Sequence, residues 1–303
     1  MSNGSQTVWT YAEQSAYDTV AGSGETWYRQ RFNGGGPSRS TSTEEDPEVG
    51  GAAGSTTSEA AAAGDFNVSL WYGMLDDHIE ALFGGTWTAD VLAPGNALRW
   101  FTFEEEQPDL LAGDTFTQFV NGAPTALSLT LPTGDRRITG TLGYSFSNGA
   151  NSATAARGAT PLQTLNTAPV MRTGNLVTNL QFDGASMASL GVRVSQMVLN
   201  ITRQTEDEPE VNVDGRGGIT YGDLTAELSI SAYDDNRTIF NSLFANTSRN
   251  ITFNVRDTGG QGYDFLLTGA SPNGGELSSP AKNTKRSQTL PYTTQNIQIT
   301  RVP

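Results

Sequence analysis

Hydrophobic and polar residues alternate along many short segments of this chain, which is the pattern of strands with one buried face. Two of the clearest runs cover residues 66–72 and 224–230. We expect further strands at residues 126–131, 136–146, 194–202, 251–255, 263–268 and 296–302. Glycine, serine, threonine and asparagine are frequent between these runs, so the sequence predicts an all-β protein with many turns.

Two segments depart from this alternation and follow helical spacing. The first runs from Leu75 to Phe83, and the second covers residues 239–244. Asp76-Asp77 and Asp234-Asp235 precede the apolar positions, so we expect these pairs to act as N-terminal caps. The pattern predicts one short α-helix beside each group of strands.

The chain repeats itself. TEEDPEV at residues 43–49 returns as TEDEPEV at 205–211, and each copy is followed by a glycine-rich stretch and then by Gly-Asp, at 64–65 and 222–223. Leu142-Gly143-Tyr144 likewise matches Leu290-Pro291-Tyr292. A conserved order of segments indicates two copies of one unit. We therefore predict two similar β-sandwich or barrel domains, residues 1–165 and 166–303, each with a short flanking helix.

Two tracts carry few large apolar side chains. Residues 33–64 and 147–170 are rich in Gly, Ser, Thr and Ala. Such composition offers little apolar surface to offset the entropy of ordering, so we expect both tracts to be long loops. Loops of this length inside a compact protein are usually functional or disordered.

The charge balance argues against tight binding of nucleic acid. The net charge of the 303-residue chain is −14, and its only lysines are Lys282 and Lys285. A protein that grips phosphates needs clustered cations. Cysteine is absent, which excludes disulfides and thiolate metal sites. No stretch is apolar for long enough to span a bilayer, and the first residues lack the features of a secretion signal, so we expect synthesis in the cytoplasm and no membrane partner.

Candidate catalytic or metal-binding residues are few. The only histidine, His78, follows Asp76 and Asp77 and precedes Glu80, but a single imidazole makes a poor transition-metal site, and the second repeat has Asn236 instead. We interpret this group as a solvated helix face. The acidic runs 44–46, 104–106 and 206–208 lack the spacing of a calcium loop, and we interpret them as solvated or interface charge. Nucleophile and phosphate-binding motifs are missing, so we predict no enzyme activity, no catalytic, cofactor or metal site, and no cofactor.

The order of segments resembles the siphophage major tail tube protein family in its two-domain form. The resemblance runs from Trp27 to Tyr292. The segments that carry it are STEEDPEV (42–49), YGMLDDHIEALFGGTW (72–87), FTFEEEQPDLLAGDTFTQFVNGAPTALSLTLPTG (101–134), GTLGYSF (140–146), VRVSQMVLNITRQ (192–204), GDLTAELSISAYDDNRTIFNSLFANTS (222–248) and YDFLLTGA (263–270).

The resemblance implies a structural virion protein, the tail tube subunit of a long-tailed bacteriophage. Its rings would stack into a hollow tube that carries viral DNA into the host. Since such rings commonly contain six domains, a two-domain chain should form a homotrimer with pseudo-sixfold symmetry, with a hexamer as the alternative. The resemblance also implies partners in the tail: a tape measure protein in the lumen, a tail terminator and a distal tail protein. The acidic balance suits a channel through which DNA slides without sticking.

Two further hypotheses remain open at this stage. The tract 33–64 would be loose in the free subunit and become ordered across the neighbouring ring when rings stack. Alternatively, the chain is a tail-tip, baseplate or receptor-binding β-sandwich that stacks sugars on exposed aromatic rings, for which the candidates are Trp9, Trp27, Trp71, Trp87 and Trp100. A glycoside hydrolase would require turnover that depends on residues 104–106.

Overall fold

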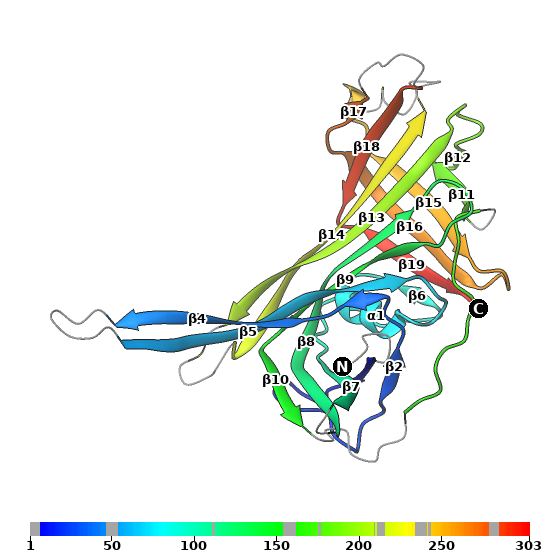
Figure 1. Cartoon of the computed structure of the whole chain (residues 1–303). Coiled ribbons are helices and arrows are strands. Elements are labelled where there is room, and N and C mark those ends of the chain that lie inside the picture. Colours follow the sequence, from blue (N-terminus) through cyan, green and yellow to red (C-terminus); the bar gives the residue numbers. More distant parts are fainter. Residues whose placement is uncertain are drawn as a thin grey trace.

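The computed structural model describes residues 7–46, 54–110, 113–153, 162–174, 177–208, 210, 216–233, 241, 244–278 and 285–303. The described chain consists mostly of antiparallel strands, with one eight-residue helix, α1 (Asp76–Phe83) (Figure 1). The prediction of a mainly β protein is therefore confirmed. No described helix has the length and apolar character needed to cross a membrane.

Strands of the first half form two sheets that share β8. One sheet has the order β2–β1–β7–β8–β10, and the other has the order β4–β5–β9–β8. Side chains of both sheets meet in an aromatic core, in which the rings of Phe66 and Tyr144 lie 5.2 Å and 4.9 Å from that of Phe103. The strands are β1 (Val8–Glu13), β2 (Tyr28–Gln30), β3 (Gly34–Gly35), β4 (Ser38–Asp46), β5 (Gly54–Ser69), β6 (Val91–Leu92), β7 (Phe101–Leu110), β8 (Gly113–Leu131), β9 (Thr139–Phe146) and β10 (Asn148–Ala153).

Strands of the second half repeat this pairing scheme. One sheet has the order β12–β11–β15–β16–β19, and in the other β13 pairs with β14, which pairs with β18, which pairs with the end of β16 and with β17. Each strand thus has a counterpart in the first half, with β16 and β17 together in the place of β8. The strands are β11 (Val177–Phe182), β12 (Ala185–Ser186), β13 (Val194–Glu208), β14 (Gly218–Tyr233), β15 (Arg249–Arg256), β16 (Gly262–Pro272), β17 (Glu276–Leu277), β18 (Ser287–Thr294) and β19 (Ile297–Val302).

The registers of the two halves agree in detail at the hairpins. The last pair of the β4–β5 hairpin is Asp46 with Gly54, and that of the β13–β14 hairpin is Glu208 with Gly218. The TEEDPEV and TEDEPEV copies thus begin in equivalent strands. The alignment of the two Gly-Asp pairs is wrong, however. Tyr144 and Tyr292 are equivalent residues, and Gly64 lies opposite Tyr144, but the residue opposite Tyr292 is Leu228 and not Gly222. A shift of six residues preserves the two-residue alternation, so alternation alone could not reveal it.

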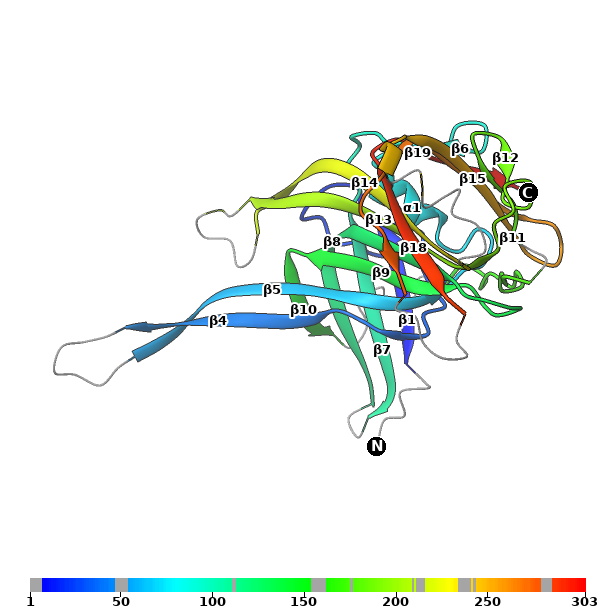
Figure 2. The same ribbon diagram turned by 90° about the horizontal axis from the view of Figure 1, so that it is seen from above.

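A single sheet runs through both halves because β8 pairs with β13. Residues 126–131 of β8 pair antiparallel with residues 197–202 of β13, which extends the sheet to the order β4–β5–β9–β8–β13–β14–β18–β17. Figure 2 shows these strands side by side from above. Leu129 and Leu199 face each other across this junction, and both are buried. The junction is therefore part of the hydrophobic core.

The tracts expected to be loops contain strands. Residues 38–46 and 54–69 pair as the long β4–β5 hairpin, so the prediction of a loose loop over 33–64 is wrong for its described part. Residues 148–153 form β10, which pairs with β8. Residues 47–53 and 154–161 lie outside the described residues. Small side chains hid these strands because they produce no alternation of apolar and polar positions.

Helix α1 begins after Leu75 and ends at Gly84, which adopts the left-handed conformation with a φ of 61°. Glycine suits this position because it has no Cβ to clash. Asp76 and Asp77 lie in the first turn and are not the caps that we expected, since the N-cap residue is Leu75 and makes no side-chain cap hydrogen bond. Most of the predicted second helix, including Asp234 and Asp235, lies outside the described residues.

Candidate assembly surfaces

The sheet that joins the two halves presents a polar face away from the core. Along β13 the buried positions alternate with partly exposed ones, and the same holds for β14 and β18. Cross-strand neighbours on this face bond to each other: the Ser128 hydroxyl donates to Asn200 Oδ1 at 2.7 Å, and the hydroxyl oxygens of Ser231 and Thr289 lie 3.0 Å apart. Hydroxyl and amide groups thus cover the face.

This polar face has a distinctive charge. Its outward side chains on the described parts of β8, β13, β14 and β18 include the carboxylate of Glu227 and no lysine or arginine. A hollow of about 370 Å³ lies over the junction of the two halves, lined in part by Ser128, Asn200 and Glu227. At the rim, Arg193 and Lys285 approach the ring of Tyr233, at 5.3 Å and 4.9 Å from its centre. A polyanion near the hollow would meet repulsion and no cation to bind.

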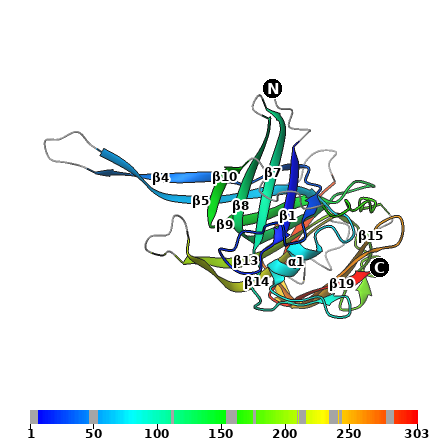
Figure 3. The same ribbon diagram turned by 90° about the horizontal axis from the view of Figure 1, so that it is seen from below.

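Two hairpins project from the molecule as arms. We call the β4–β5 hairpin the first arm and the β13–β14 hairpin the second arm. Figures 1 and 3 show both on the same side of the molecule, with the first arm reaching farther from the body. Because no strand of the described chain covers the outer edge of β4, its backbone is an available template for pairing.

Arg216 fastens the second arm to the first half of the chain. Its guanidinium donates to the backbone oxygens of Asn121 at 3.0 Å and Ser145 at 2.9 Å, and it forms an ion pair with Asp207 at 2.8 Å. The Tyr17 hydroxyl donates to the backbone oxygen of Arg216 at 2.7 Å. Only 4% of the Arg216 side chain is exposed, so these bonds fix the base of the arm.

Helix α1 carries a second polar contact between the halves. The carboxylate of Asp76 accepts hydrogen bonds from the Tyr263 hydroxyl and from Arg301 Nη1, the latter at 3.0 Å. Arg301 also pairs with Asp90 at 3.0 Å and covers the ring of Trp87. Burial raises the pKa of Asp76, although the bonds from Tyr263 and Arg301 oppose that shift. The contact holds α1 against the second half.

His78 is buried, and the prediction of a solvated helix face is wrong. Its ring has no exposed surface, and its Nδ1 lies 2.7 Å from the Tyr144 hydroxyl. Nearby carboxylates are equally engaged, since Asp77 accepts from the Tyr11 hydroxyl at 2.9 Å and Glu80 pairs with Arg99 at 3.0 Å. Burial lowers the pKa of His78 to about 4, so the ring is neutral near pH 7. The sequence could not show this burial, because the aromatic residues around His78 come from strands that only the fold brings together.

The acidic runs do not converge into a site. Glu44 to Asp46 lie in β4, Glu104 to Glu106 lie in β7 with Glu104 buried, and Glu206 to Glu208 lie in β13. These strands belong to different sheets or to different arms. Among the described residues, no group of three or more His, Asp or Glu side chains is placed to hold a metal ion.

The tryptophans do not form an exposed sugar-binding platform. Trp27, Trp71 and Trp100 are buried. Trp9 and Trp87 are partly buried and pack against the main hydrophobic cluster. Each ring therefore has a packing role, and the alternative of a receptor-binding module loses the feature that suggested it.

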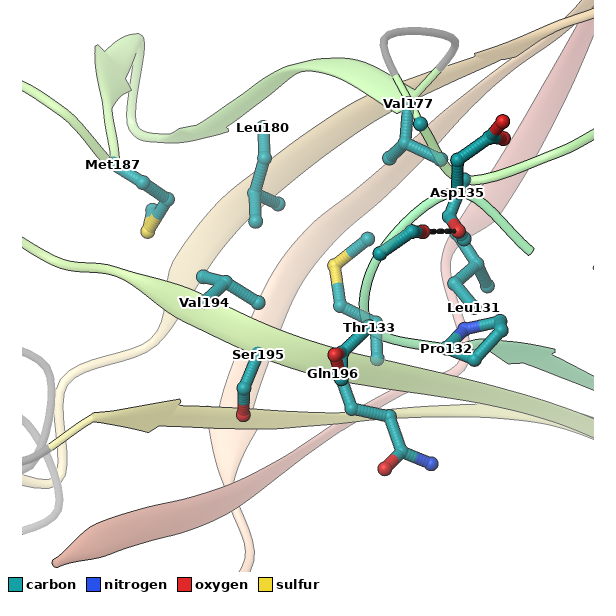
Figure 4. A pocket seen from close by; sticks show the side chains of 14 residues that line it. Leu131, Pro132, Thr133, Asp135, Val177, Leu180, Met187, Val194, Ser195 and Gln196 are labelled. Carbon is teal, nitrogen blue, oxygen red and sulfur yellow. Dashed lines mark hydrogen bonds between the residues drawn. The ribbon is translucent and has the colours of Figure 1, made fainter. Parts of the chain in front are cut away.

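A pocket of about 490 Å³ opens between the two halves, where residues 131–135 of the first half meet residues 173–197 of the second (Figure 4). Its apolar lining comes from Leu131, Val177, Leu180, Met187, Val194 and Met197. The one carboxylate at its rim, Asp135, is paired with Arg172 at 2.9 Å. Thr133, Thr173, Ser195 and Gln196 add polar side chains to the lining. The polar face, the two arms and the open edge of β4 are the candidate assembly surfaces.

The chain matches one known protein family over most of its length. Residues 4–294 match the family described as phage tail tube protein. No curated protein sequence matches the chain.

Proposed function

This chain belongs to the phage tail tube protein family, and from that premise we propose how its copies build the tube. The protein is a structural subunit of the virion tail, it has no enzymatic role, and it assembles with copies of itself. The open questions are which surfaces meet and which face lines the channel.

The duplicated pairing scheme supports a division into two domains, residues 1–165 and 166–303. If each domain occupies one position of a six-position ring, three chains close a ring with pseudo-sixfold symmetry. A hexamer of chains would instead give twelve positions and a wider bore. The proposal of a trimer rests on the junction between β8 and β13, which places two neighbouring ring positions in one continuous sheet.

The polar face of the joined sheet is our candidate for the channel lining. It is rich in hydroxyl groups, it carries the Glu227 carboxylate, and its described strands offer no cation to phosphate. DNA would therefore pass without the counterion release that makes cationic surfaces hold it. The tape measure protein would occupy the same channel before DNA, while the tail terminator and distal tail protein would contact the two ends of the tube.

The first arm is our candidate for contact between stacked rings. It extends from the body as paired strands, so it would reach the next ring as a formed hairpin and not as a loose loop. Deletion of residues 34–62 should abolish long tubes, and so should the shorter deletion of residues 42–59, which keeps the base of the hairpin at Ser38 and Ala63. Normal tubes from either deletion variant would refute this role of the arm.

Electron microscopy of the concentrated protein, with mass from light scattering, tests the assembly. We expect rings or hollow tubes with a bore close to the width of a DNA duplex, and a ring mass of three chains. A ring of six chains would replace the trimer. A protein that binds glycans and forms no rings, even in the presence of tail-tip proteins, would overturn the proposed channel.

A further inference from the structure

The two ends of the joined sheet are counterparts of its internal junction. In the order β4–β5–β9–β8–β13–β14–β18–β17, β8 and β13 meet in the middle, whereas β17 and β4 lie at the two ends. In the repeated pairing scheme, β17 continues the strand equivalent to β8, and β4 is equivalent to β13. The strands that lack a neighbour at the two ends therefore correspond to the two strands that pair in the middle.

Residue registers define the first end. Pro124 lies opposite Tyr144, and Pro272 lies opposite Tyr292. Four residues later, Ser128 lies opposite Thr141, and Glu276 lies opposite Thr289. Both strands also shift register by one residue in between. Glu276 and Leu277 are thus the equivalents of Ser128 and Leu129.

The second end follows in the same way. Ser38 lies opposite Ala63, one residue before the Gly64 that faces Tyr144. Asn200 lies opposite Glu227, one residue before the Leu228 that faces Tyr292. Ser38 and Pro37 are thus the equivalents of Asn200 and Leu199.

We propose that β17 of one subunit pairs antiparallel with β4 of the next, with Glu276 opposite Ser38 and Leu277 opposite Pro37. This pairing rests on the self-assembly proposed above and names its contact. It repeats between subunits the junction that β8 and β13 form within one chain. A heterologous contact of this kind closes into a ring when the rotation per subunit divides a full turn.

The chemistry of the paired positions matches the internal junction. Ser128 and Asn200 hydrogen-bond on the polar face, and the Ser38 hydroxyl can donate to the Glu276 carboxylate in the same place. Leu129 and Leu199 meet on the core side, where Leu277 and Pro37 supply the apolar pair. Ser38 and Glu276 are exposed in the single chain and so are accessible to another subunit.

Pro37 makes the contact between subunits weaker than the internal one. The Gly36 amide donates to Asp65 in β5. Backbone groups of successive residues in a strand point to opposite sides, so those of Pro37 point toward the open edge. Proline has no N–H to donate there. Proline on an edge strand also discourages uncontrolled pairing of free subunits. The edge is therefore open to a partner that supplies the correct register and core contact.

Engineered disulfides test this register directly, because the chain has no cysteine of its own. The alternation that starts at Gly36 makes Ser38 and Glu276 a non-hydrogen-bonded pair, whose Cα atoms lie about 4.5 Å apart, within disulfide range. Under oxidising conditions the variant Ser38→Cys/Glu276→Cys should convert most assembled protein from monomers into covalent multimers up to the full ring. Each single variant should yield dimers at most.

Two further variants serve as controls. Ser128→Cys/Asn200→Cys should close within one chain and leave its mass unchanged, which verifies the geometry at the internal junction. Ser38→Cys/Thr268→Cys places the second thiol at an exposed position of β16 outside the proposed edge, and it should give no multimers. Tubes that form without multimers of Ser38→Cys/Glu276→Cys, while the internal pair closes, would overturn the β17–β4 pairing alone. A wild-type chain that forms no tubes with its tail-tip partners would overturn the proposed assembly itself.

Discussion

Pro124 lies directly opposite Tyr144, at the point where β8 leaves one sheet and enters the other. Up to Gly122, β8 pairs with β7, and from Ala126 it pairs with β13, so the missing N–H of Pro124 falls between two partner strands. Pro272 and Tyr292 form the same pair in the second half. The two tyrosines differ in their contacts: Tyr144 contacts His78, and the second half has no histidine.

Replacing Tyr144 with phenylalanine should therefore lower the free energy of unfolding. The variant removes the hydroxyl 2.7 Å from His78 Nδ1 and leaves a fully buried ring nitrogen without that partner. The expected loss is about 1–3 kcal/mol, measured by urea denaturation. Tyr28→Phe, at a residue that is 39% exposed, is the control and should change stability by less than ~0.5 kcal/mol. Equal effects of the two variants would contradict a buried Tyr144–His78 bond.

Stability should fall in mild acid because His78 is buried in its neutral form. Its folded pKa of about 4 lies below the ordinary histidine value of 6.5, so the unfolded chain binds the extra proton first as pH decreases. The contribution is fully present above pH 6.5 and is lost as pH falls toward 4, where the loss reaches about 3 kcal/mol. Asp76, whose pKa burial raises, acts with the opposite sign because its protonation favours the folded state in acid.

The variant His78→Gln isolates this histidine, since glutamine is neutral at every pH. We expect the difference in unfolding free energy between the wild type and the variant to change by about 3 kcal/mol between pH 7 and pH 4. Denaturant titrations at several pH values measure it. A difference that is independent of pH would show that His78 has the same pKa in the folded and unfolded chains, as an exposed ring would.

Arg203 should be important for stability although it lies far from α1 in the sequence. Its guanidinium donates to the backbone oxygen of Phe83, the last residue of α1, at 3.0 Å and to that of Gly95, in the segment after the helix, at 2.9 Å. Arg203→Met keeps an apolar stem but leaves these carbonyls without the charged donor, which should cost about 2–4 kcal/mol. Arg137→Met, at an exposed arginine, is the matched control. A small effect at both positions would mean that water replaces Arg203.

Sequence alone predicted the mainly β fold, many of its strands and the position of α1, because alternation and helical spacing are local signals. The TEEDPEV and TEDEPEV repeat marked equivalent places in the two halves, although no hairpin was predicted at either. Contacts between distant segments could not be predicted. His78 is adjacent to acidic residues in sequence, yet its ring packs on Tyr11 and Phe103 from other strands. The first part of β5, residues 54–65, was missed because its small alanine, threonine and serine side chains give no apolar alternation.

The charge of the polar face makes a separate prediction about DNA passage. Glu227 lies on this face beside Asn200, and Glu227→Lys would replace a repelling charge with one that releases counterions from phosphate. Tubes of this variant should assemble normally and should retain DNA at low salt, with release as salt increases. Phage carrying the substitution should eject DNA more slowly, as measured by dye uptake after receptor triggering. Thr268→Lys puts the same charge at an exposed position of β16, outside this face, and should leave ejection unchanged. If Thr268→Lys retains DNA and Glu227→Lys does not, the channel is lined by a different face of the protein.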